Sequence, residues 1–131
     1  IAGLHGALTF LKGVGIDRIH AHEEALLIRF LEGLSAMDNV TVYGSKDPKK
    51  KTAVVSLNIQ GMPSSVVGEK LESRYGIVVR TGAHCAPLIH EAMGTRNTGA
   101  VRFSFSYFTT EEEVDAALRA LEEIRKESVD A

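Results

Sequence analysis

The chain has 131 residues, which fits one domain, and its formal net charge of -2 gives no basic field that would point to nucleic acid or an anionic membrane. Apolar residues make up 44% and charged residues 24%, values ordinary for a globular protein, and no apolar run approaches the ~18 residues of a membrane helix. The one cysteine cannot form an internal disulfide, and a lone thiol suits a reducing compartment. We therefore expect a cytoplasmic protein without membrane or nucleic-acid partners.

The chain opens inside a helix. Ile1 stands in an apolar-periodic stretch with no capping residue before it, and Gly15 follows the end of that stretch. We interpret residues 1–16 as the end of a helix that links to a larger preceding domain, and residues 17–131 as a small domain. A processed natural terminus is the alternative. Asp17 is expected to cap a second helix with a continuous apolar stripe.

The middle of the chain is predicted to alternate strands with one helix. A short strand at 40–43 leads into a polar turn, and the alternation of apolar and polar residues over 55–59 indicates a second strand. A helix over 65–75 is expected to end at Gly76 in the left-handed conformation. The apolar run 77–79 then predicts a short, buried strand.

The last third is predicted to hold a loop, a strand and a helix. The loop contains one short helix at 88–93, and the strand spans 101–107. Thr110 and Glu113 form a capping box for the final helix. The element order indicates an α+β fold: a two-layer sandwich with a small, mostly antiparallel sheet covered by helices.

The loop around Cys85 is the most informative stretch. Pro87 fits the first turn of a helix, which places Cys85 just before a helix N-terminus. Arg80 and His84 can add positive charge, and such surroundings favour the reactive thiolate. The alternative is a buried, structural cysteine, but a polar loop that contains Gly82 favours a reactive thiol.

Arg102 is the second candidate. It alternates with apolar residues on the last strand and therefore points away from the core, where its planar fork could hold a carboxylate. Taken alone, an ordinary solvated arginine is the more common interpretation. His84, Cys85 and His90 do not suffice for a metal, since a structural zinc site uses four ligands, usually with several cysteines.

Three segments together resemble one family. The sequence Val79-Arg80-Thr81-Gly82-Ala83-His84-Cys85-Ala86-Pro87-Leu88 is similar to the active-site cysteine segment of group II (SufS-like) cysteine desulfurases, within the class V aminotransferases. The strand Val101-Arg102-Phe103-Ser104-Phe105 and the start of the following helix fit the same family. In place of the family's usual residues, Phe108 follows the tyrosine, Ala83 precedes His84, and the cysteine segment is a residue shorter, which indicates a divergent subgroup.

The resemblance implies a mechanism and partners. Such enzymes use pyridoxal 5'-phosphate to move sulfur from L-cysteine to an enzyme cysteine as a persulfide, release alanine, and pass the sulfur to an acceptor protein, for example in iron–sulfur cluster assembly. The match makes Cys85 the nucleophile, Arg102 the carboxylate ligand, Arg80 a substrate-binding residue at the site mouth, and His84 a supporting residue.

The resemblance also implies parts that this sequence does not carry. It places the cofactor mainly in a large domain, with the Schiff-base lysine after a histidine, and none of the lysines here follows a histidine. It further implies the small C-terminal domain of a fold-type I enzyme, a homodimer when full length, and an inactive isolated chain. Another class V aminotransferase or lyase, or a non-catalytic binding module, are the alternatives.

Overall fold

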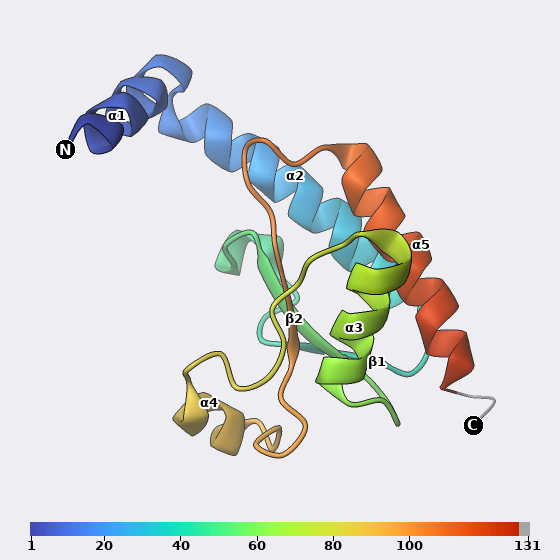
Figure 1. Cartoon of the computed structure of the whole chain (residues 1–131). Coiled ribbons are helices and arrows are strands. Elements are labelled where there is room, and N and C mark those ends of the chain that lie inside the picture. The colour runs from blue at the N-terminus through green and yellow to red at the C-terminus, as the bar shows by residue number, and fades with distance from the viewer. Residues whose placement is uncertain (129–131) are drawn as a thin grey trace.

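A computed structural model describes residues 1–128. It is an α+β fold in which helices lie against one side of a small sheet (Figure 1), as expected from the sequence. The elements are α1 (Ala2–Val14), α2 (Ile16–Ser35), β1 (Val40–Tyr43), η1 (Pro48–Lys50), β2 (Val54–Ile59), α3 (Ser64–Tyr75), α4 (Pro87–Ala92), β3 (Val101–Ser104) and α5 (Glu111–Glu127).

The sheet has three strands in the order β1-β2-β3, and both pairings are antiparallel. Leu57 of β2 lies opposite Val42 on one side and Val101 on the other, whereas Ser56 lies opposite Tyr43 and Arg102. Because side chains alternate along a strand, the apolar residues share one face and the polar residues share the other. We call these the inner face and the outer face.

The inner face forms the core with three helices. Val55, Leu57 and Ile59 are at most 2% exposed, and Phe103 contacts Phe30 of α2 with ring centroids 5.0 Å apart. The helices contribute the remaining buried apolar residues: Leu26, Leu27, Phe30 and Leu34 of α2, Val67 and Leu71 of α3, and Val114, Ala117, Ala120, Leu121 and Ile124 of α5. Burial of this set stabilises the fold at roughly 25 cal/mol per Å² of apolar surface.

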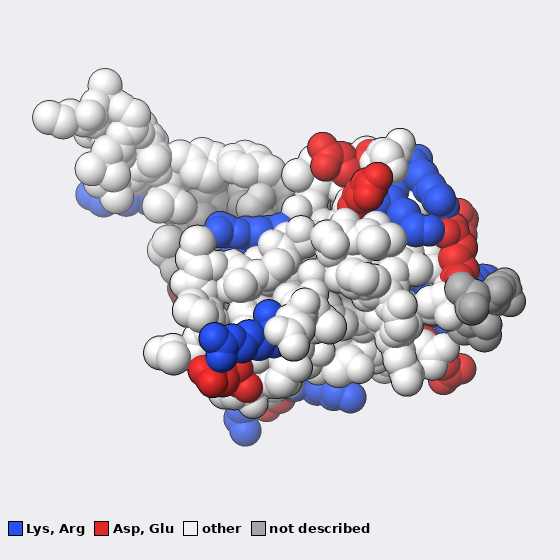
Figure 2. Space-filling view, turned by 60° about the horizontal axis from the view of Figure 1, so that its bottom comes forward, with Lys and Arg blue, Asp and Glu red and all other residues white. Residues whose placement is uncertain are grey.

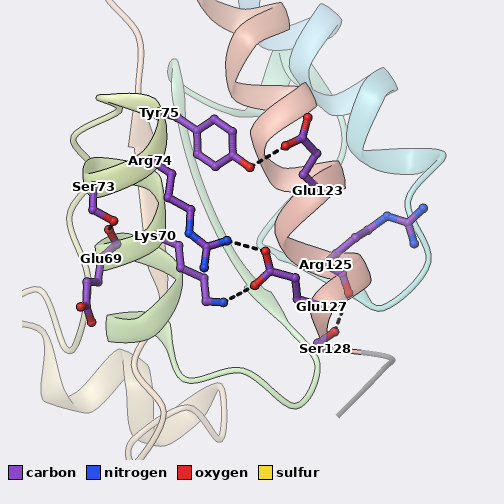
Figure 3. A network of polar contacts seen from close by, with 9 residues as sticks. All are labelled: Glu69, Lys70, Ser73, Arg74, Tyr75, Glu123, Arg125, Glu127 and Ser128. Carbon is purple, nitrogen blue, oxygen red and sulfur yellow. Dashed lines mark hydrogen bonds and ion pairs between the residues drawn. The ribbon is translucent and has the colours of Figure 1, made fainter.

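Polar contacts join α3 to α5 at the rim of this core. Lys70 and Arg74 of α3 both donate to the carboxylate of Glu127, and the Tyr75 hydroxyl donates to Glu123 at 2.7 Å (Figure 3). The two cations hold the pKa of Glu127 below its ordinary value of 4.5, chiefly through the hydrogen bond from Lys70. The pairs are exposed or half-buried, so they fix helix orientation more than they add stability.

Helix α1 stands apart from the core. None of its residues is buried, and Leu4 and Leu8 are 65% and 49% exposed. The helix projects from the body of the molecule, and in the space-filling view it carries few charged atoms (Figure 2). Phe10 stacks on Phe108 and meets Tyr107 edge to face, which ties the end of α1 to the turn after β3.

Several local predictions are confirmed. Gly76 ends α3 with φ 66°, and the hydroxyl of Thr110 and the carboxylate of Glu113 form both bonds of the capping box of α5. Pro87 occupies the first turn of α4, so Cys85 does precede a helix N-terminus. These signals were reliable because each depends on the chemistry of one or two residues and not on the rest of the fold.

Three expectations about elements are wrong. Residues 77–79 form no strand: Val78 is 79% exposed, and the amide of Ile77 donates to the carbonyl of Leu71 as part of the α3 cap. A groove of about 440 Å³ lies along this segment, beside Phe103 and the first turns of α5. The capping bond ties residues 77–79 to α3, and the groove separates them from the neighbouring strand. The described residues therefore form three strands, not the four that the sequence predicted.

The other two wrong expectations concern the end of the last strand and the N-cap of α2. The last strand ends at Ser104, not Tyr107, because the chain turns where the amide of Ser106 donates to Thr109 Oγ1 at 3.0 Å. Asp17 does not cap α2: Gly15 is the N-cap, and Asp17 lies within the first turn without a capping bond.

Candidate functional site

The outer face of the sheet carries polar side chains. Tyr43, Asn58 and Arg102 lie on β1, β2 and β3 and are each half-buried. The Asn58 amide nitrogen donates to the Gly99 carbonyl at 2.8 Å and to the Tyr43 hydroxyl at 3.2 Å. The sheet thus supplies a rigid base from which polar groups project away from the core.

The loop that bears Cys85 crosses beside this face. Arg80 and Arg102 form an isolated antiparallel bridge, with their amides donating to each other's carbonyls at 3.2 and 2.8 Å. The loop therefore leaves the sheet edge at Arg80, next to Arg102. Cys85 follows five residues later and is exposed, which agrees with the expectation that the thiol is accessible.

The backbone of the loop is strained at the thiol. His84 and Cys85 have φ angles of 52° and 59°, in the left-handed region that side chains with a Cβ seldom adopt. Two consecutive residues in this region cost of order 1–3 kcal/mol each, and such strain gathers at functional sites. Contacts around the loop must maintain this shape.

One of these contacts reaches the thiol itself. Arg80 Nη2 lies 3.5 Å from Cys85 Sγ, so a guanidinium faces the sulfur as the sequence led us to expect. The one thiol of the sequence thus has a guanidinium as its neighbour. His84 Nε2 lies 3.1 Å from the carbonyl oxygen of Arg80 and donates to it, which closes a ring around the base of the loop.

The surroundings of His84 oppose the positive charge that the sequence led us to expect from it. Burial lowers its pKa below the ordinary 6.5; the bond to the Arg80 carbonyl opposes this, and the charges of Arg102, His90 and Arg80 add to it. The imidazole is thus neutral near neutral pH. With Nε2–H donated to the Arg80 carbonyl, Nδ1 is the ring atom that can accept a proton.

A buried pair supports the loop from below. His90 of α4 is 2% exposed, and its Nδ1 lies 2.8 Å from Thr95 Oγ1, which is also buried. The rings of His84 and His90 meet edge to face with centroids 5.5 Å apart. The Thr95 amide donates to the His90 carbonyl at 2.8 Å, so the end of α4 and the chain beyond it form one packed unit.

Part of the Arg102 guanidinium is buried. Its Nε is fully buried and has no hydrogen-bond partner among residues 1–128, while the residue as a whole is half-exposed. Nε is therefore inside the fold, and the exposed part of the residue is available on the outer face. This position suits a guanidinium that presents its Nη atoms to a carboxylate.

The structure thus brings three of the predicted residues, Arg80, His84 and Cys85, into contact, and places Arg102 beside Arg80. Sequence reasoning missed Asn58, which falls in the alternating stretch 55–59, and the buried pair of His90 and Thr95. A polar residue in an otherwise alternating strand was the available signal for Asn58. Among the described residues, no group of three or more His, Cys, Asp or Glu side chains is placed to hold a metal.

Comparison with known proteins shows the family. Residues 1–117 match the model of the family described as aminotransferase class-V, and the chain belongs to that family. A probable cysteine desulfurase of Halobacterium salinarum is 36% identical over 120 residues, which are 92% of this chain and 28% of that protein. A probable cysteine desulfurase of Halalkalibacterium halodurans is 35% identical over 124 residues, 95% of this chain and 29% of that protein.

Solved structures agree with the fold. The apo structure of the cysteine desulfurase from Thermococcus onnurineus NA1 matches with a TM-score of 0.89 and 35% identity over 95% of this chain and 30% of that one. The cysteine desulfurase CsdA of Escherichia coli, in an S-sulfonic acid form, matches with a TM-score of 0.83 at 23% identity over 95% of this chain and 29% of that chain, which bears on the fold alone. The chain therefore spans less than a third of the length of these relatives. Within residues 1–128, no helix is both long and apolar enough to cross a membrane.

Proposed function

We propose that this chain is the small C-terminal domain of a pyridoxal-phosphate-dependent cysteine desulfurase of group II, and that Cys85 receives the sulfur. One observation carries the proposal: the single thiol of the chain is exposed on a strained loop, 3.5 Å from the guanidinium of Arg80 and beside the strand that holds Arg102. A thiol, two cations and an open face are what a reaction between a thiolate and an anionic amino acid requires.

The transfer balances without an added oxidant. The thiolate of Cys85 attacks the sulfur of L-cysteine, so that an S–S bond forms and the Cβ–S bond of the substrate breaks. The electron pair of the broken bond remains on Cβ, and a proton completes the methyl group of alanine. Cys85 is left as a persulfide, and an acceptor protein then takes the outer sulfur.

Arg102 and Arg80 hold the substrate in this scheme. The carboxylate of L-cysteine binds the Nη atoms of Arg102, because a planar guanidinium can give two parallel hydrogen bonds. Arg80 stands at the mouth of the site, between the carboxylate and the thiol. His84 supports the loop and, as a neutral imidazole, can hold the proton that leaves the thiol.

The cofactor belongs mainly to another part of the protein. When bound, pyridoxal phosphate stabilises negative charge on the substrate carbons. The Arg102 side chain, buried at Nε and half-exposed as a whole, fits a substrate carboxylate. Four lysines make contacts elsewhere: Lys70 with Glu127, Lys126 with Glu122, Lys50 with Asp47 and Lys51 with the Tyr43 carbonyl. We therefore assign the Schiff-base lysine to a large domain and expect no cofactor absorbance from the 131-residue chain alone.

The remaining proposals follow the family. We assign residues 1–16 to the end of a helix that links to the large domain, since α1 has exposed apolar residues such as Leu4 and Leu8 and none that is buried. Residues 17–131 form the small domain. The full-length enzyme is proposed to be a cytoplasmic homodimer that serves iron–sulfur cluster assembly.

The test is sulfur transfer by the full-length enzyme. With L-cysteine and cofactor, Cys85 should gain about 32 Da as a persulfide, seen by mass spectrometry of the peptide that contains it. Cys85→Ser should still bind L-cysteine but lose sulfide release by at least ~100-fold. Exposed Ser65 provides a control, because Ser65→Ala should leave turnover unchanged. If Cys85→Ser retains full turnover, the thiol is incidental and another class V reaction replaces this one.

A further inference from the structure

Two buried polar atoms on the outer face have no hydrogen-bond partner among residues 1–128. One is the donor Nε of Arg102, and the other is the acceptor Oδ1 of Asn58. Both are too deeply buried for solvent to satisfy them, and a buried polar atom without a partner is costly. A native structure that leaves two such atoms on one face calls for an explanation.

The two atoms belong to neighbouring positions. Ser56 pairs with Arg102 across the β2–β3 ladder, so Asn58, two residues further on, is the diagonal neighbour of Arg102 on the same face. Diagonal neighbours have Cα atoms about 7–8 Å apart, a separation that long side chains such as arginine can bridge. A donor and an acceptor that are complementary therefore lie within side-chain reach of each other.

The orientation of the Asn58 amide is fixed by its other contacts. Its nitrogen donates to the Gly99 carbonyl at 2.8 Å and to the Tyr43 hydroxyl at 3.2 Å. A flipped amide would set Oδ1 against the Gly99 carbonyl oxygen, which repels it. Oδ1 is thus held on the side of the amide that points away from the Gly99 carbonyl. There it can accept a hydrogen bond from another donor.

We propose that Asn58 is the positioning residue of Arg102: its Oδ1 accepts the Nε–H of Arg102 when the two Nη atoms engage a carboxylate. The guanidinium is then held in one plane with both Nη atoms directed at the ligand. This inference rests on the proposed role of Arg102 as the carboxylate ligand. It adds that amino-acid affinity depends on a residue that never touches the substrate.

The test is steady-state kinetics of the full-length holoenzyme with L-cysteine. Asn58→Ser removes Oδ1 together with the amide nitrogen, because the shorter hydroxyl reaches the place of neither atom. We expect KM to rise about three- to tenfold with kcat nearly unchanged, as for a lost interaction that binds substrate and transition state alike. Asn58→Asp should raise KM further, because its carboxylate competes for Arg102. Ser65→Ala, at an exposed position of α3 away from Arg102, is the control and should leave both constants unchanged.

A double-mutant cycle separates positioning from a merely structural role. Lysine keeps the charge at position 102 but lacks Nε–H, so Asn58→Ser should raise KM no further in an Arg102→Lys background. An equal rise in both backgrounds, or a fall in kcat and melting temperature with KM unchanged, would overturn the positioning role and leave that of Arg102 intact. If Arg102→Lys itself leaves KM and kcat unchanged, the carboxylate role fails, and this inference fails with it.

Discussion

The two faces of one small sheet are built on different principles. On the inner face, Val55, Leu57 and Ile59 are buried under helices whose apolar stripes match them. On the outer face, Ser56 lies opposite Arg102 and Asn58 donates to the Gly99 carbonyl, while two buried polar atoms there have no partner among residues 1–128. The inner face is optimised for burial, whereas the outer face tolerates unpaired groups and strain that a ligand or another domain can relieve.

The sharpest test of this contrast uses adjacent residues of β2. Leu57→Ala should reduce the free energy of unfolding by about 2–5 kcal/mol, because it leaves a cavity at a fully buried position. Ser56→Ala, one residue away and pointing outward, should change it by less than about 0.5 kcal/mol. Urea denaturation of the chain followed by circular dichroism measures both. Equal effects would show that the outer face is as tightly packed as the inner one.

The second test concerns how the outer face holds the cysteine loop. A Cβ on Gly99 would lie 2.5 Å from the Cα of Gly82, and Gly99 has φ 63°. Gly99→Ala should cost about 1–3 kcal/mol from backbone strain alone and more from the clash, with faster alkylation of Cys85 as the loop is displaced.

Gly94 is the matched control for that substitution. Its φ is 67°, but a Cβ there would meet no atom within 4 Å. Gly94→Ala should therefore show only the cost of the left-handed conformation, about 1–2 kcal/mol. If the two variants are equally destabilised, close approach of residues 82 and 99 does not fix the loop.

The third test addresses the helical layer over the inner face. Thr110→Ala removes the capping hydroxyl of α5 and should cost about 1 kcal/mol. Glu113→Gln keeps both bonds of the capping box and should lower the free energy of unfolding by no more than a few tenths of the cost of Thr110→Ala. Thermal unfolding distinguishes the two. A cost for Glu113→Gln equal to that of Thr110→Ala would mean that charge, not capping geometry, stabilises the first turn.

The same contrast explains what the sequence could predict. The inner face follows from alternation in β2 and β3 and from helical periodicity, and the ends of α3 and α5 follow from Gly76 and Thr110, because these signals are local. The run 77–79 misled us because an apolar strand pattern does not reveal that the Ile77 amide is used in a helix cap.

The site was predictable only in part. Cys85 and Arg80 are close in sequence, and the nearness of Arg102 came from family resemblance. The packing of His90 against His84 depends on the path of the loop into α4, and the state of the Asn58 amide depends on its contact with Gly99, 41 residues away. No pattern of residue types encodes such contacts, since alternation places a side chain on a face but does not say what it meets there.

The smallest expected effect tests the state of His84. Burial lowers its pKa below 6.5, so the folded protein binds this proton less readily than the unfolded chain does. Stability from this group is therefore fully present above pH 6.5 and is lost as the pH falls from 6.5 through the folded pKa. A nuclear magnetic resonance titration of the His84 ring should give a midpoint below the ordinary histidine value of 6.5. His84→Gln should remove this part of the stability change between pH 7 and 5, while the acid loss tied to Glu127 below pH 4.5 remains. His90→Phe keeps a ring against His84 and removes one of the smaller causes of its lowered pKa, so the His84 midpoint should rise only slightly, because burial is the largest cause. A midpoint at or above 6.5 would mean that His84 is solvated, and its proposed role in supporting the cysteine loop would then fail.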